Sequence, residues 1–178
     1  MQIYQHKHID YCFVVVCIDS STGLFKNTID SIQQQHPGVP AICVVPKGTD
    51  PETTKFMESR CEVSHGGSTV TSLINEGFRK AQREWAFVVF SGSLARLKMQ
   101  EKISFYIQSK KDILFPVANN IANFVDGTMN GMLVHRDTFR LVGNMPEDSD
   151  LGLSKAIWAH EAVNHGCRLK AIVGAKIC

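Results

Sequence analysis

The run from Trp85 to Phe90, WAFVVF, constrains the fold of this chain more than any other feature. A continuous apolar run rich in aromatic and β-branched residues is typical of a strand covered on both faces, as in a parallel sheet flanked by helices. The polar turn Ser91-Gly92-Ser93 then ends the strand. Ligands of open α/β sheets lie outside the carboxyl ends of the strands, so a binding site is expected near this turn.

The segment before this strand predicts a helix that packs on the sheet. Gly66 and Gly67 allow unusual backbone dihedrals, and Ser68 is expected to cap the first helical turn. One helical face is then apolar, at Val70, Leu73, Ile74, Phe78 and Ala81.

The same alternation of apolar runs and helical periods extends along the chain. Strands are expected over 12–18 and 41–45, with a helix over 24–35 between them. This connection is too long for a hairpin, so the two strands should be parallel, with a right-handed crossover. Each is followed by a polar turn, Asp19 to Gly23 and Pro46 to Pro51.

The rest of the chain predicts helices over 52–59 and 99–109 and strands over 61–63, 112–117, 127–135 and 169–173. A long helix should begin after Glu147 and end near Gly166, with inward apolar positions at Leu151, Leu153, Ile157, Ala159, Ala162 and Val163. The predicted fold class is α/β, a three-layer α/β/α domain. Its sheet should be mostly parallel, with 12–18, 41–45 and 85–90 adjacent at the centre and one antiparallel element in the second half.

Composition excludes several classes of protein. The chain has 178 residues, 44% of them hydrophobic, which fits one globular domain. A formal charge of +2 without a basic stripe gives no basis for nucleic-acid binding. No apolar segment reaches the roughly 20 residues of a membrane helix, and the start lacks a signal-peptide pattern, so we expect no transmembrane segment and a cytoplasmic location. The six cysteines lack metal-site spacing and are expected to be reduced core residues.

Familiar catalytic motifs are missing. The Gly66-Gly67 pair belongs to neither a dinucleotide-binding nor a P-loop pattern, so neither a dehydrogenase nor a kinase is supported. His160 and His165 are five residues apart, which separates them by roughly 140° on a helix and excludes a zincin site.

The order of elements and turns resembles the GT-A nucleotide-diphospho-sugar transferases, specifically the inverting family-two glycosyltransferases, over most of the chain. FVVVCIDSSTGLFKNTIDSIQQQ is similar to their opening strand, nucleotide loop and first helix. GGSTVTSLINEGFRKAQREWAFVVFSGS resembles the Gly-rich turn, the Asn-containing helix and the strand that bears their Asp-x-Asp motif. PEDSDLGLSKAIWAHEAVNHGCRLKAI resembles the Glu-Asp motif, its helix and the closing strand.

The resemblance implies one GT-A domain over 1–178, with a nucleotide-binding half at about 8–97 and an acceptor-side half at about 98–178. It implies a UDP- or GDP-sugar as donor, an acceptor of unknown identity, and hexosyl transfer with inversion. Asp148 corresponds to the catalytic base, with Glu147 as the second choice. The implied nucleotide-sugar contacts are Asp19, Ser20, Lys47, Gly67, Asn75, Ser91 and Ser93.

Two departures from the family pattern bear on chemistry. Pro46-Lys47-Gly48-Thr49 stands where the family has Asp-Asp-Gly-Ser, which removes an acid expected near the nucleotide base. Ser91-Gly92-Ser93 replaces Asp-x-Asp, and hydroxyls bind Mg²⁺ or Mn²⁺ less well than carboxylates. We therefore assign no metal ligands and expect either cation to contribute little.

Each site residue also has a purely structural interpretation. Acids such as Glu147 and Asp148 are favoured in the first turn of a helix by its dipole, and Asp19, Ser91 and Ser93 are common turn formers. The cations Lys47, Arg79, Arg96 and Lys98 either neutralise a diphosphate or lie on a solvated surface. Two functions follow: a glycosyltransferase that works without a carboxylate-bound metal, or a catalytically inactive GT-A-like module that binds a sugar, a nucleotide or a protein.

Overall fold

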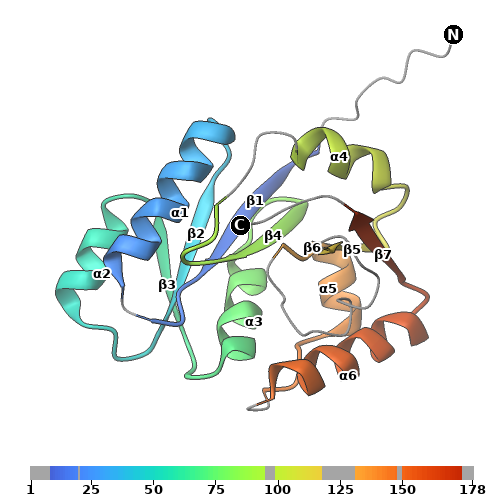
Figure 1. Cartoon of the computed structure of the whole chain (residues 1–178). Helices are drawn as coiled ribbons and strands as arrows, with labels where there is room; N and C mark the ends of the chain where they lie inside the picture. Colours follow the sequence, from blue (N-terminus) through green and yellow to red (C-terminus); the bar gives the residue numbers. More distant parts are fainter. Residues whose placement is uncertain (1–8, 20, 95–98, 118–130, 148–149, 174–178) are drawn as a thin grey trace, which may run out of the picture.

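The computed structural model describes residues 9–19, 21–94, 99–117, 131–147 and 150–173. Its centre is a seven-stranded sheet in the order β3-β2-β1-β4-β6-β5-β7 (Figure 1). Four neighbouring pairs are parallel, and β6 is antiparallel to both β4 and β5. The predicted adjacency of the strands near 12–18, 41–45 and 85–90 is confirmed, as is the antiparallel element in the second half.

The strands are β1 (Tyr11–Val16), β2 (Ala41–Pro46), β3 (Glu62–Gly66), β4 (Trp85–Phe90), β5 (Asp112–Val117), β6 (Leu133–His135) and β7 (Arg168–Val173). The helices are α1 (Thr22–Gln35), α2 (Pro51–Glu58), α3 (Val70–Lys80), α4 (Met99–Tyr106), α5 (Arg136–Val142) and α6 (Leu151–Asn164).

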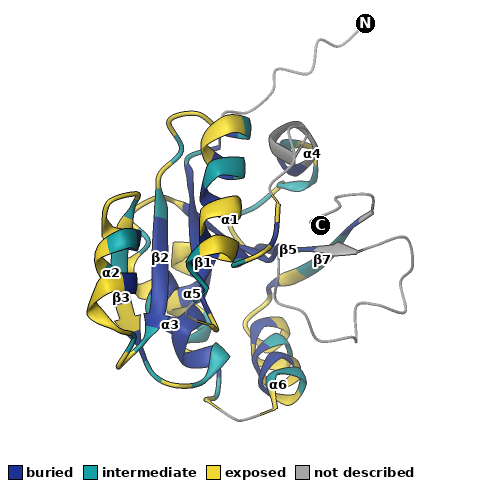
Figure 2. Ribbon diagram, turned by 60° about the vertical axis from the view of Figure 1, so that its left-hand side comes forward, coloured by how far each residue is buried: buried dark blue, intermediate teal, exposed yellow. Residues whose placement is uncertain are grey.

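Two apolar clusters, one on each face of the sheet, make the three predicted layers. The first joins the sheet to α1, α2 and α4 through residues such as Phe25, Met57 and Ile103. The second joins it to α3, α5 and α6 through residues such as Leu73 and Trp158. All six residues of β1 are buried between the layers, as Figure 2 shows. The α/β/α fold class is therefore confirmed.

Strands β5 and β7 are held together by the buried carboxylate of Asp112. It accepts hydrogen bonds from the backbone of Gln108 (2.7 Å) and Ser109 (2.9 Å) and from the side chains of Arg168 (2.8 Å) and Lys170 (3.0 Å). Burial opposes the charge, but these bonds outweigh it and keep the pKa of Asp112 below its ordinary value. By contrast, among the described residues β5 pairs with β6 at one position, Leu114 with Leu133.

Two expectations were wrong in detail, and one could be compared with the structure only in part. The cap of α3 is Thr69, whose side chain accepts a hydrogen bond from the Ser72 amide, and not Ser68. Helix α5 was not predicted, because its cap is a histidine, His135, which is not a usual start signal. The part of the predicted 127–135 strand before Gly131 lies outside the described residues.

The inward face of α6 also differs from the prediction. Leu153, Ile157 and Val163 are exposed, and the buried positions are Ser154, Lys155, Trp158 and Ala162. The indole of Trp158 donates a hydrogen bond to the carbonyl of Gly143 (2.8 Å). Because α6 carries apolar residues on several sides, periodicity alone does not predict its rotation about its axis. The observed rotation buries Trp158 and allows its bond to Gly143.

The cysteines of the described residues are free thiols: Cys12, Cys17, Cys43, Cys61 and Cys167. Four of them are buried, as core residues were expected to be, and Cys178 lies outside the described part of the chain. None of the helices in the described ranges combines the length and apolar character needed to cross a membrane.

Helix α3 lies unusually close to the sheet at Gly77. A Cβ atom at this position would be 2.1 Å from Cγ1 of Val14 in β1 and 3.3 Å from Cγ2 of Val44 in β2. Real Cβ atoms do not show a contact as short as the one to Val14, and the one to Val44 is tighter than usual, so glycine allows α3 to approach both strands at this depth.

We expect Gly77→Ala to lower the free energy of unfolding by about 2 kcal/mol, because an overpacking cost of about 3 kcal/mol against β1 exceeds the ~1 kcal/mol that alanine adds to a helix. Urea denaturation measures this. Gly23→Ala in α1 is the matched control: nothing lies within 4 Å of its Cβ position, so stability should hold or rise. Equal stability of wild type and Gly77→Ala would contradict the close packing.

His135 is a buried histidine that joins β6 to α5. Its Nδ1 accepts a hydrogen bond from the Asp137 amide (3.1 Å), and its ring meets Trp85 edge to face at 5.0 Å. Among the described residues, its Nε2 has no hydrogen-bond partner. Burial lowers the pKa of His135 below its ordinary value of 6.5.

The unfolded chain therefore binds a proton at His135 more readily than the folded protein does. Stability should be fully present above pH 6.5 and should fall as the pH drops below that value. His135→Asn, which keeps a cap acceptor, should remove part of this loss in urea titrations at pH 7.5 and 5.5. His160→Gln, at an exposed position, is the control, and an unchanged pH dependence in His135→Asn would refute the assignment.

Candidate functional site

Polar turns follow the four parallel strands on one side of the sheet. Because β3, β2, β1 and β4 are neighbours and run in the same direction, their carboxyl ends share one edge (Figure 1). The turns at this edge begin at Gly67, Lys47, Cys17 and Ser91. This is the edge at which open α/β sheets bind ligands.

A pocket of about 280 Å³ opens at this edge. It extends along the polar side of α3, whose rise from Ser72 to Arg79 is about 10 Å. One wall comes from the ends of β2 and β3, and the other from the segment between α5 and α6. Its lining residues are Lys47, His65, Gly66, Gly67, Ser72, Asn75, Glu76, Arg79, Asn144 and Glu147.

The Gly66-Gly67 turn makes room for the pocket. A Cβ on Gly67 would lie 2.6 Å from Oγ of Ser72 and 3.9 Å from Oε2 of Glu147. A Cβ on Gly66 would lie 2.9 Å from the side chain of Leu73. The backbone at 66–67 is therefore packed between α3 and the Glu147 segment, where a larger residue would not fit.

The pocket contains both positive and negative side chains, of which one pair forms an ion pair and, among the described residues, the other two do not. Glu76 accepts hydrogen bonds from Ser64 and Arg79, and although burial opposes its charge, these bonds keep the pKa of Glu76 below its ordinary value. Within the described part of the chain, neither Lys47 nor Glu147 has an ion-pair partner. One cation and one carboxylate are thus available to a ligand.

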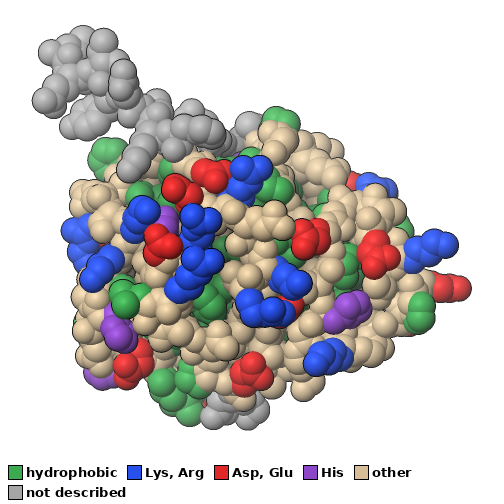
Figure 3. Space-filling view, turned by 180° about the vertical axis from the view of Figure 1, so that it is seen from behind, with side chains coloured by type: hydrophobic (Ala, Val, Ile, Leu, Met, Phe, Trp, Pro, Cys, Tyr) green, Lys and Arg blue, Asp and Glu red, His purple; other side chains and the backbone are tan. Residues whose placement is uncertain are grey.

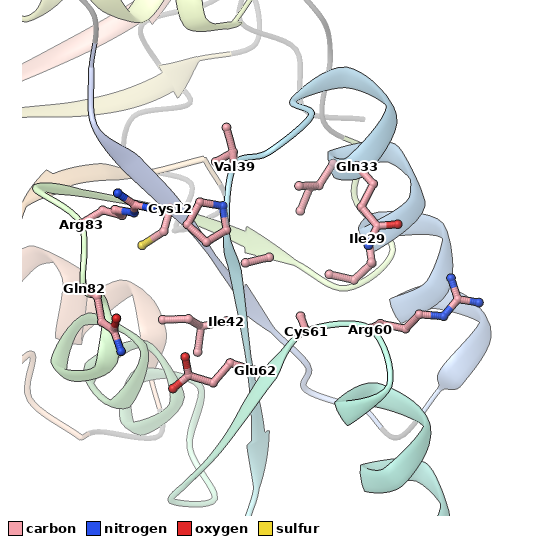
Figure 4. A pocket seen from close by; sticks show the side chains of 13 residues that line it. Cys12, Ile29, Gln33, Val39, Ile42, Arg60, Cys61, Glu62, Gln82 and Arg83 are labelled. Carbon is pink, nitrogen blue, oxygen red and sulfur yellow. The ribbon is translucent and has the colours of Figure 1, made fainter.

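A larger cavity of about 640 Å³ lies at the opposite edge, where the strands begin (Figure 4). Its two arginines are already paired, Arg60 with Asp30 and Arg83 with Asp10. Elsewhere, on the face seen in Figure 3, Lys and Arg side chains lie among Asp and Glu and form no single basic stripe. The smaller pocket therefore remains the candidate site, since it lies at the carboxyl edge and has polar walls.

The structure brings four of the predicted site residues together. Lys47, Gly67, Asn75 and Glu147 line the pocket. Both amide atoms of Asn75, however, are bonded to the backbone of Met145, at 2.9 Å each. Ser20 and Asp148 lie outside the described residues.

The other predicted residues lie at the same edge but not in this pocket. Asp19 accepts a hydrogen bond from the Ser21 amide (3.2 Å), as a turn former does. Ser91 and Ser93 flank Gly92, whose φ is +92°. The amide of Gly92 donates a hydrogen bond to Oγ1 of Thr28 in α1 (2.9 Å). This turn is therefore tied to α1, on the other side of β1 from the pocket.

Sequence patterns did not single out His65, Ser72, Glu76 and Asn144 as lining residues. A signal existed for α3, because Ser72, Glu76 and Arg79 recur at helical spacing opposite the apolar stripe. No such signal existed for Asn144, which reaches the pocket only through the path of the α5–α6 segment.

The Ser91-Gly92-Ser93 turn does not fit a divalent cation. Its side chains offer hydroxyls, whereas Mg²⁺ and Mn²⁺ in proteins are held mainly by carboxylates. In the residues that the structure describes, no group of three or more His, Cys, Asp or Glu side chains is placed to hold a metal ion.

No model of a known protein family matches the sequence, and no curated protein matches it. Solved structures do match. S. aureus TarS 1–349 superposes with a TM-score of 0.67 and 13% identity, over 95% of this chain and 59% of that chain. The same fragment in complex with UDP-GlcNAc superposes with a TM-score of 0.64 and 14% identity, over 95% of this chain and 57% of that chain. M. tuberculosis glucosyl-3-phosphoglycerate synthase superposes with a TM-score of 0.65 and 8% identity, over 94% of this chain and 72% of that chain.

This chain has the GT-A fold. The expected resemblance to GT-A nucleotide-sugar transferases is thus confirmed at the level of the fold, which is what identities of 8 to 14% support. The chain spans somewhat more than half the length of the TarS fragment. Within this fold, the pocket lies at the end of the sheet that contains β3 and β2, beside helix α3.

Proposed function

We propose that this protein binds a nucleotide-diphospho-sugar in the pocket at the carboxyl edge and transfers the sugar to an acceptor hydroxyl. The observation that carries the proposal is the joint placement of Lys47, the Gly66-Gly67 turn and Glu147 around one pocket of a GT-A sheet. A lysine attracts phosphate oxygens, and a carboxylate accepts hydrogen bonds from hydroxyl or base N–H groups. Because a neighbour of this fold was crystallised with UDP-GlcNAc, a UDP-sugar is the first donor to test, followed by a GDP-sugar.

In this proposal Asp148 is the general base. Its carboxylate takes the proton of the acceptor hydroxyl as the oxygen attacks the anomeric carbon. The bond from that carbon to the nucleoside diphosphate breaks on the opposite face, so the configuration inverts and the diphosphate leaves. Lys47 stabilises the negative charge of the diphosphate, in a site where a positioned cation is worth more than in water.

A second function is favoured by the Ser91-Gly92-Ser93 turn. Without carboxylates at this position, a GT-A domain can keep a nucleotide or sugar pocket and lack turnover. Binding without product formation from any donor would select this function. The cytoplasmic location and the division into two halves stay predictions.

Lys47→Ala should weaken binding of UDP by about tenfold, the loss expected for one charge-assisted bond to phosphate. Calorimetry with UDP, GDP and UDP-GlcNAc measures this. Lys26→Ala, an exposed lysine of α1, is the charge-matched control and should bind like wild type. If wild type binds none of these nucleotides, or if Lys47→Ala binds as tightly as Lys26→Ala does, the pocket is not the nucleotide site.

A divalent cation should change the affinity for UDP by less than tenfold, or about 1.4 kcal/mol. The reason is that the β4 turn offers hydroxyls instead of carboxylates. Ser91→Asp with Ser93→Asp should create a dependence on Mn²⁺, whereas the neutral pair Ser91→Asn with Ser93→Asn should not. Titrations in Mn²⁺ and in chelator decide this, and a tenfold gain from Mn²⁺ in the wild type would contradict it.

A further inference from the structure

We propose that Asn75 is a positioning residue: its side-chain amide clamps the backbone of Met145 and thereby holds Glu147 at the wall of the pocket. The inference deepens the proposed function and rests on it for the meaning of the pocket. The clamp itself is a feature of the fold and can be tested without any ligand.

The clamp is a pair of complementary hydrogen bonds. Nδ2 of Asn75 donates to the carbonyl of Met145, and the amide of Met145 donates to Oδ1 of Asn75, both at 2.9 Å. Both residues are buried, at 5% and 1% exposure, so water competes little for these groups. They are 70 positions apart in the sequence, so the pair joins α3 to the segment between α5 and α6.

A buried asparagine in the middle of α3 destabilises the protein unless its amide forms hydrogen bonds. Asparagine is a weaker helix former than alanine, and a buried amide without partners destabilises a protein. Asn75 lies at the border between the apolar and polar sides of α3, and it is buried with Phe78 on one side of it. The Met145 backbone forms hydrogen bonds with both polar groups of the amide, which explains why a buried asparagine is tolerated here.

The clamp acts close to Glu147. Two residues span at most about 7 Å, so fixing the Met145 backbone limits where the Glu147 carboxylate can lie. A second anchor, the bond from Trp158 to Gly143, is four residues away from Glu147 and constrains it less. Glu147 Oε2 lies 3.9 Å from the Cβ position of Gly67, beside Ser72, one helical turn before Asn75. Helix α3 thus fixes both walls of the pocket.

Two variants and one control test the role of Asn75. Asn75→Leu removes both bonds and keeps the number and branching of the side-chain heavy atoms. Asn75→Asp keeps the acceptor for the Met145 amide but, when ionised, has no donor for the Met145 carbonyl. A protonated carboxyl has an O–H and restores the donor, so this variant should recover as the pH falls. Thr71→Val, at a buried position of the same helix whose hydroxyl pairs with Thr69, is the control.

The first measurement is amide hydrogen exchange of the peptide containing Met145, which needs no ligand. We expect Asn75→Leu to exchange about tenfold faster or more there, since a buried hydrogen bond is lost and its partner is left unpaired. Asn75→Asp should exchange faster at pH 7.5 and approach wild type, compared at equal pH, at pH 5. Thr71→Val should match wild type at both pH values.

The second measurement is calorimetric affinity for UDP-GlcNAc and UDP. Asn75→Leu should bind at least tenfold more weakly, and Asn75→Asp should recover with falling pH in parallel with its exchange. Wild-type protection in both variants would overturn the clamp, and faster exchange with unchanged affinity would overturn the positioning role. If wild type binds no nucleotide, the proposed function fails while the exchange data still decide the clamp. If Asn75→Leu does not fold, the pH profile of Asn75→Asp decides alone.

Discussion

The depth at which α3 lies on the sheet is the constraint on which the candidate site depends. The helix contacts β1, β2 and β3, and the absence of a side chain at Gly77 lets it approach Val14 and Val44. At this depth Leu73, Ile74 and Phe78 fill the core while Ser72 and Arg79 line the pocket. One helix therefore supplies apolar packing on one side and a ligand-facing wall on the other.

The electrostatics of the pocket follow from how its charges are paired. Glu76 and Arg79 neutralise each other, which leaves Lys47 and Glu147 as the groups that can respond to a ligand. Lys47 stands where the resembled family has an acid, and the carboxylate of the pocket that is not paired with Arg79 comes from Glu147, about 100 positions later in the chain. The two opposite charges suit a ligand that presents both phosphate oxygens and hydrogen-bond donors.

The sequence predicted the centre of the sheet well because β1, β2 and β4 are continuous apolar runs rich in β-branched and aromatic residues, which are typical of strands covered on both faces. The runs at 12–18, 41–45 and 85–90 identified three adjacent parallel strands, and the turns after them marked the correct edge. Features that depend on contacts between distant residues could not be predicted. Examples are the burial of Trp158 in α6 with its bond to Gly143, and the two bonds between Asn75 and Met145. Neither pairing leaves a periodic signal in the chain.

The single position at which β5 pairs with β6 gives the described sheet an uneven mechanical strength. Strands β1 and β4 are joined at six positions, and β5 and β7 also at six, with the Asp112 network reinforcing the second pair. Among the described residues, the junction between β6 and β5 is thus the one joined at the fewest backbone positions. We therefore expect strands β5 and β7 to open together, at a lower cost in free energy than unfolding of the β1–β4 centre.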